Sequence, residues 1–136
     1  MFRDGVLTPR EAAAQNALAL AFLGDGVYSL LVREALTAAG DRKIGALHAE
    51  SAALVNAAAQ AKGYEKIRPY LTEDEADVYR RARNAHNAHT PKNMTVGDYH
   101  SATGLEAVFG YLRLCGADER IRELFDIIMN GKDITE

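Results

Sequence analysis

The sequence has little of several residue types that define particular classes of protein. It contains one cysteine, Cys115, three prolines and no tryptophan. A single cysteine excludes a disulfide framework and a cysteine-rich zinc module, and it fits a reducing compartment. The first residues lack the apolar core of a signal peptide. The longest nearly uncharged apolar run, residues 17–32, is shorter than the ~20 residues needed to span a bilayer. We therefore expect a soluble cytoplasmic protein with no membrane partner.

The residues that are present favour a helical domain. The 136 residues are 48% hydrophobic and 26% charged, which is typical of a single globular domain spanning residues 1–136. Alanine occurs 24 times, and alanine favours helix because it loses no side-chain entropy there. Apolar residues recur with a period of 3.6, and no segment alternates convincingly as a strand does. We predict an all-α fold of about six or seven helices.

Capping and stop signals predict where the first helices begin and end. A capping box at Thr8-Pro9-Arg10-Glu11, with proline at the first helical position, begins a helix that runs with a possible break to a stop at Gly40. A second long helix is expected from about Gly45 to Lys62, with Gly63 as its stop.

The second half of the chain carries similar signals. Tyr64 to Tyr70 is expected to form a short helical turn, and a capping box at Thr72-Glu73-Asp74-Glu75 begins a helix that reaches Arg83. Asp98 is the expected N-cap of a helix that ends before Gly116. Asp118 caps the last helix, whose apolar stripe consists of Ile121, Leu124, Phe125 and Ile128.

Asp25 is the most unusual residue because it stands alone in the apolar segment 17–32. A helix that is apolar on every face is usually buried in a core or an interface. A carboxylate there loses its hydration unless it is paired or bound to a metal. Gly24 and Gly26 each cost a helix about 1 kcal/mol relative to alanine, which fits the close approach of another backbone, a subunit or a ligand. A hydrogen bond to a neighbouring helix N-terminus is the alternative.

Glu106 is a second isolated acid, the only charge between Ala102 and Leu112. Small residues at Ala102, Thr103 and Gly110 leave one helix face open around its carboxylate. Two carboxylates on two otherwise apolar helices could converge on Mg²⁺, which takes one or two carboxylates together with waters and a substrate phosphate. A buried polar contact is the alternative.

The net charge of −3 argues against a nucleic-acid partner, but the basic residues are clustered. A local basic patch, more than the global charge, is what meets a phosphate. Residues 80–92 contain two histidines, no acid and the four bases Arg80, Arg81, Arg83 and Lys92. An ordinary solvated helix end would have the same composition. His86, His89 and His100 also suggest a zinc site, but no cysteine lies nearby and no pair has i, i+4 helical spacing, so we favour surface or RNA-facing histidines.

Several segments in order resemble the ribonuclease III family. Residues 22–27 (Phe-Leu-Gly-Asp-Gly-Val) resemble its signature helix, and residues 106–112 resemble its second acidic helix. Residues 83–85 and 89–93, with Tyr99, Ser101 and Thr103, resemble more specifically the Mini-ribonuclease III branch, a short bacterial form. The resemblance covers about residues 16–130.

The resemblance implies an all-α endonuclease domain that forms a homodimer, with Asp25 and Glu106 at a Mg²⁺-dependent catalytic site. Two further acidic positions of the larger family members fall on Ala21 and Thr103 here. The resemblance also implies cleavage of double-stranded RNA and maturation of precursor 23S ribosomal RNA. A ribosomal protein bound to that RNA would be a further partner.

The basic segment and the apolar segment 17–32 suggest where RNA and a second subunit bind. Duplex RNA is recognised mainly through its backbone and shape, so we assign phosphate contacts to Arg80, Arg81, Arg83 and Lys92. The dimer contact is expected on the signature helix, where one patch meets its own copy and Phe22, Leu23 and Tyr28 complete their burial.

Two other functions fit parts of the sequence. A catalytically silent ribonuclease III-fold module could bind structured RNA as an assembly factor, and the missing acids at Ala21 and Thr103 support it. Isolated carboxylates at Asp25 and Glu106 argue against it, because an RNA-binding scaffold has no need of them. A helical protein-interaction module would leave the basic segment 80–92 unexplained.

Overall fold

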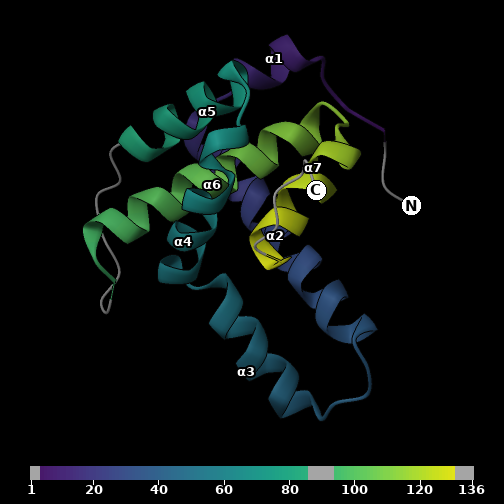
Figure 1. The fold of residues 1–136 in the computed structure, drawn as a ribbon. Helices are drawn as coiled ribbons and strands as arrows, with labels where there is room; N and C mark the ends of the chain where they lie inside the picture. Colours follow the sequence, from purple (N-terminus) through teal and green to yellow (C-terminus); the bar gives the residue numbers. More distant parts are fainter. Residues whose placement is uncertain (1–3, 86–93, 131–136) are drawn as a thin grey trace.

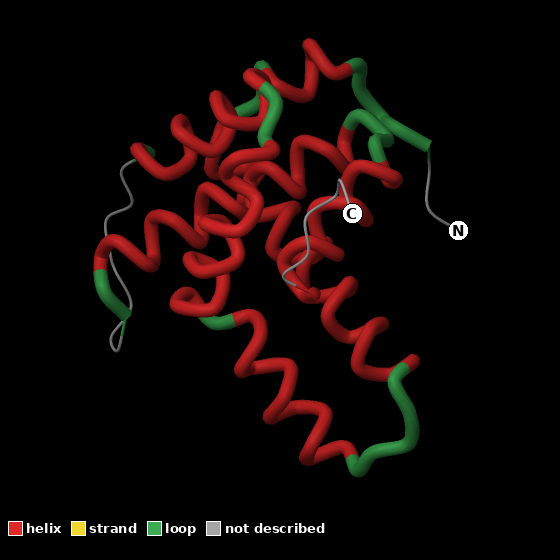
Figure 2. Tube along the Cα trace, viewed as in Figure 1, coloured by secondary structure: helices red, strands yellow, loops and turns green. Residues whose placement is uncertain are grey.

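The computed structural model describes residues 4–85 and 94–130, and these form helices with no strand among them (Figures 1 and 2). This confirms the predicted all-α class. The helices are α1 (Pro9–Ala13), α2 (Ala17–Ala38), α3 (Ile44–Val55), α4 (Ala57–Ile67), the 3₁₀ helix η1 (Arg68–Tyr70), α5 (Glu73–Asn84), α6 (Val96–Leu114) and α7 (Asp118–Asn130).

Helix α6 is the centre of the fold, with α2, α4 and α5 packed against it (Figure 1). Residues 107–112 of α6 are buried without interruption. A helix that is covered on every side must be apolar all round, which explains why Glu106 is the only charge in this part of α6. The other elements therefore surround the helix that carries one of the two candidate acids.

Helix α3 and the end of α2 project from the body of the molecule (Figure 1), and no residue of α3 is buried. The sequence predicted one helix from Gly45 to Lys62, but the chain turns at Asn56, whose ψ is 162°. The Asn56 amide donates to the Ala52 carbonyl, and its oxygen accepts from the Ala59 N–H at 2.9 Å. One asparagine thus ends α3 and begins α4.

The predicted helix stop at Gly63 is also wrong, because α4 continues to Ile67. Gly63 is buried, and a Cβ there would lie 3.0 Å from Cγ2 of Ile128. This glycine gives α7 room to pack against α4 and does not end a helix.

Most other predicted boundaries are confirmed. Both capping boxes, at Thr8 and Thr72, are formed. Gly40 and Gly116 have φ of 137° and 76° and follow helix ends. The N-cap of α6 is Thr95, and Asp98 instead lies in its first turn, as the predicted cap Asp118 does in α7. The stripe of α7 (Ile121, Leu124, Phe125 and Ile128) is buried. In the two described ranges, no helix has the length and apolar character needed to cross a bilayer.

Candidate active site

Helices α2 and α6 cross backbone to backbone at two glycines. A Cβ on Gly24 would lie 1.6 Å from the backbone oxygen of Glu106, and one on Gly110 would lie 2.0 Å from the backbone oxygen of Leu20. No side chain fits at either point, so the close approach expected at Gly24 is confirmed, whereas a Cβ on Gly26 would meet no described atom within 4 Å. Because Asp25 directly follows Gly24, the crossing brings its carboxylate to Glu106.

The two predicted acids therefore meet at one place. Asp25 is exposed and Glu106 is half-buried, and their side chains are close enough to share a hydrogen bond. Burial, the charge of Asp25 and that hydrogen bond raise the pKa of Glu106 from 4.5 to about 8. Without a cation, this pair retains a proton near neutral pH.

A third polar group, which the sequence did not reveal, completes the site. The Gln60 side chain on α4 is only 3% exposed, and its Nε2 donates to Oε2 of Glu106 at 3.3 Å. This bond lowers the pKa of Glu106 and so opposes the larger effect of burial. The sequence holds one indication of this role: Gln60 is a polar residue on the same helix face as Ala57 and Ile67, which are buried.

Tyr28 is buried in the core, near enough to Glu106 to be affected by its charge. It is 1% exposed, and its ring contacts Phe109 and Phe125 edge-on at centroid distances of 5.3 and 5.7 Å. Burial, with a smaller contribution from the charge of Glu106, raises its pKa to about 12. A fully buried side chain cannot complete its burial across a two-fold axis, so the assignment of Tyr28 to a dimer interface is wrong.

The donor set at this site fits Mg²⁺. The described residues contain no cluster of three or more His, Cys, Asp or Glu groups, so a closed structural zinc site is not formed there. Mg²⁺ needs only one or two carboxylates and keeps several waters. Over residues 4–85 and 94–130, neither Asp25 nor Glu106 forms an ion pair. A divalent cation would supply the missing positive charge.

The two positions that are acidic in larger family members supply no charge here. Ala21 is 7% exposed and packs in the core. The Thr103 hydroxyl donates to the backbone oxygen of Tyr99 at 2.9 Å. Asp25 and Glu106 are therefore the acids that the crossing places together.

The predicted RNA-binding arginines of α5 have different surroundings. Arg80 is exposed and pairs with Asp77. Arg81 is half-buried, and its guanidinium donates to the backbone oxygens of Ala13 and Gln15 and to Asp77. Arg81 thus holds the end of α1 against α5, which leaves it less available to a phosphate.

Arg83 lies on a groove of about 440 Å³ between α4, α5 and α6, which Glu65 and Asp98 also line. Its guanidinium lies 5.7 Å from the ring centroid of Tyr79, and that ring stacks on Tyr64 at 3.7 Å. Lys62, which no sequence pattern marked as a candidate, lines the same groove. Lys92, His86 and His89 lie outside the described residues, and His100 is half-buried in α6.

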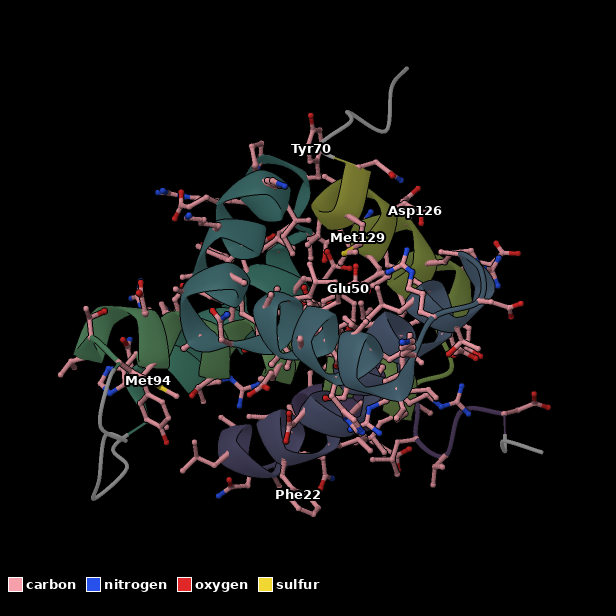
Figure 3. All side chains as sticks on the ribbon, turned by 90° about the horizontal axis from the view of Figure 1, so that it is seen from below. Phe22, Glu50, Tyr70, Met94, Asp126 and Met129 are labelled. Carbon is pink, nitrogen blue, oxygen red and sulfur yellow. The ribbon has the colours of Figure 1, made fainter. Side chains whose placement is uncertain are left out.

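An apolar surface without a partner in the described part of the chain runs along α2. The Phe22 side chain is 84% exposed and points away from the body of the molecule (Figure 3). Leu23 lines a neighbouring groove of about 470 Å³ between α2 and α7, together with Val27, Leu30 and Phe125. We call Phe22 and this groove the α2 face.

Comparisons with known proteins agree with this arrangement. The Ribonuclease III domain family matches residues 18–116. A Thermoanaerobacter protein named Mini-ribonuclease 3 is 39% identical over 122 residues, which cover 90% of this chain and 86% of the relative. The Mini-ribonuclease 3 of Brevibacillus brevis is 44% identical over 115 residues, with coverages of 85% and 86%.

A solved structure supports the same assignment. The crystal structure of a Fusobacterium nucleatum protein is similar with a TM-score of 0.78 at 34% identity, and the match covers 87% of this chain and 94% of that one. The resemblance recognised in residues 22–27 and 106–112 is thereby confirmed. The chain belongs to the ribonuclease III family of endoribonucleases.

Proposed function

We propose that this chain is a Mg²⁺-dependent endoribonuclease that cleaves double-stranded RNA at Asp25 and Glu106. One observation carries the proposal: two carboxylates are held together on touching helices, and the described residues supply no counter-charge. Such a pair is unfavourable for stability, because burial and like charge both oppose ionisation. It is favourable for binding a hard cation, which prefers carboxylate oxygens.

The chemistry divides between the cation and the side chains. Bound Mg²⁺ would activate a water and offset the charge on the phosphate and the leaving oxygen. Asp25, which is exposed, meets the solvent and the incoming RNA backbone. Glu106, which is half-buried, anchors the site from the central helix. The two acids thus bind the cation at the surface while the fold fixes their separation.

For RNA, we propose a path that includes the groove of Arg83 and Lys62. Both side chains are cationic and line one groove beside α6, together with the acids Glu65 and Asp98. The backbone phosphates are the main target of basic residues in duplex recognition. Arg80, Arg81 and Lys92 remain assigned to this path as predictions. For Arg81, the bonds to Ala13 and Gln15 favour a structural role as well.

The proposed physiological substrate is precursor 23S ribosomal RNA in the bacterial cytoplasm. This substrate is what the resemblance to the Mini-ribonuclease III branch implies. A ribosomal protein bound to the RNA is the further partner in this proposal. Cleavage of purified precursor RNA, measured with and without ribosomal proteins, tests both the substrate and the partner.

We also propose a homodimer through the α2 face. Phe22 is a large apolar side chain that the described chain leaves 84% exposed, and an isolated apolar patch next to an apolar groove is typical of an interaction site. Two-fold symmetry lets one copy of this patch meet another. Two sites related by that axis would face the two strands of an antiparallel duplex.

The alternative is a silent RNA-binding module, which the uncharged side chains at Ala21 and Thr103 favour. Incubation of the protein with a duplex RNA in Mg²⁺ or in EDTA distinguishes the two functions. We expect cleavage in Mg²⁺ that is abolished by Asp25→Asn and by Glu106→Gln, with duplex binding retained. Binding without cleavage by the wild type, or near wild-type turnover by either variant at saturating Mg²⁺, would refute the proposed site.

A further inference from the structure

Gln60 is a buried amide on a helix face that is otherwise apolar or small. Its side chain is 3% exposed, and the other buried residues of α4 are Ala57, Gly63 and Ile67. Leaving a buried polar group without a hydrogen bond costs about 1–3 kcal/mol, so a glutamine here requires a polar partner. In the part of the chain that is described, the partner of its side chain is the Glu106 carboxylate, at 3.3 Å.

The bond connects a third helix to the crossing of α2 and α6. Glu106 interacts with Asp25 of α2 and with Gln60 of α4, so two different helices act on one carboxyl group. The backbone of Gln60 is itself fixed, because its N–H donates to the Asn56 carbonyl at 3.0 Å in the first turn of α4. A fixed donor restricts the orientation of a carboxylate that otherwise rotates about its terminal torsion.

We propose that Gln60 is a positioning residue for the carboxylate pair. Its amide holds Glu106 in the orientation that binds a divalent cation beside Asp25, an inference that rests on the proposed function. Gln60 itself is neutral and buried, so its effect passes through Glu106. Removing such outer partners of a metal ligand typically lowers metal affinity or activity by about 10–100-fold.

Gln60→Met tests this role because methionine is unbranched, has a similar volume and donates no hydrogen bond. Gln15→Met is the matched control, since Gln15 is the other glutamine of the chain and its exposed amide donates to the backbone oxygen of Glu11 at 3.4 Å. Calorimetry measures Mn²⁺ binding to the RNA-free protein, and cleavage of a short RNA duplex gives kcat and KM.

We expect Gln60→Met to weaken Mn²⁺ binding by about 10–100-fold and to lower kcat. KM for RNA should be unchanged, and Gln15→Met should behave like the wild type. A folded Gln60→Met with wild-type Mn²⁺ affinity and kcat would overturn the role of Gln60, while cleavage by the wild type would leave the proposed function standing. A higher KM with unchanged Mn²⁺ affinity would also overturn it, because the effect would then lie in RNA binding.

A second variant covers the case in which Gln60→Met does not fold. Gln60→Asn keeps the buried amide but draws it back by one methylene, and it should show the same loss of Mn²⁺ affinity. Wild-type affinity in Gln60→Asn would overturn the inference. A wild-type protein that neither binds Mn²⁺ nor cleaves duplex RNA would overturn the proposed function, and the role of Gln60 with it.

Discussion

Glu106→Gln should stabilise the metal-free protein, although it removes an acid that we propose to be essential for cleavage. Burial and the neighbouring Asp25 raise the pKa of Glu106 from 4.5 to about 8. Between these pH values the folded protein holds a proton that the unfolded chain has released, so the free energy of unfolding falls as the pH rises. The glutamine of the variant resembles the protonated acid and does not ionise, so the free energy of unfolding of the variant does not fall in this way.

The magnitude follows from the two pKa values. Each pH unit between them lowers the stability of the wild type by about 1.4 kcal/mol relative to the variant. The difference is therefore below about 1 kcal/mol at pH 5 and reaches about 3 kcal/mol at pH 7. For a domain of this size, about 3 kcal/mol corresponds to a rise in Tm of roughly 10 °C.

Thermal and urea unfolding at pH 5 and pH 7 in EDTA measure this difference, with Asp126→Asn at an exposed position of α7 as the control. Adding Mg²⁺ should raise the Tm of the wild type, because the cation binds the folded pair, and should leave Glu106→Gln nearly unchanged. Equal stability of Glu106→Gln and the wild type at pH 7 in EDTA would refute the reasoning, since Glu106 would then carry no electrostatic cost.

Three further predictions concern the helix crossing, the RNA path and the dimer. Gly24→Ala should destabilise the protein by about 1–3 kcal/mol in urea unfolding and weaken Mn²⁺ binding, because its Cβ would separate the helices that hold the carboxylate pair. Gly26→Ala, whose Cβ meets nothing within 4 Å, is the control and should bind Mn²⁺ normally. Replacing Lys62 and Arg83 by methionine should weaken duplex binding in fluorescence anisotropy and reduce its salt slope by about 1–2; an unchanged slope would place the RNA elsewhere. Phe22→Glu should give a monomer or an aggregate in light scattering and lose double-strand cleavage, whereas an active wild-type monomer at micromolar concentration would contradict the dimer.

The candidate acids could be predicted from the sequence because each is the lone charge of an apolar helix segment. The surroundings of Asp25 differ from the expectation of burial, since its side chain is exposed. The reason is that α2 buries one face against α6 and leaves Phe22 and Leu30 in solvent. An apolar helix segment indicates that its surface is buried, but it does not show whether the same chain or a partner buries it.

Residues 44–67 were harder to predict because both helices are rich in alanine. Alanine is compatible with burial and with exposure, so the period of 3.6 is weak and the break at Asn56 gave no signal. Asparagine occurs inside helices and at caps alike, and only the turn of the backbone distinguishes the two. Gln60 was missed for a related reason, because its partner Glu106 lies 46 residues away in the sequence.

Charge alone could not separate the roles of the arginines in α5. Arg80, Arg81 and Arg83 are consecutive members of one basic segment, yet Arg81 donates to backbone oxygens near the end of α1. Those oxygens belong to residues more than 60 positions earlier in the chain. A local sequence pattern cannot show which guanidinium will donate hydrogen bonds to a distant backbone carbonyl.

The spacing of small residues on two helices determines where the site lies. Gly24 faces the backbone of Glu106, and Gly110 faces the backbone of Leu20. Each glycine therefore contacts the partner helix one turn before the glycine of that helix. This reciprocal arrangement fixes the register of α2 on α6, because a slip would force a Cβ between the two backbones. Steric exclusion thus holds Asp25 against Glu106 in spite of their repulsion. Under the proposed function a divalent cation would remove that repulsion, so the glycines that build the helix crossing would also generate the affinity of the site for a cation.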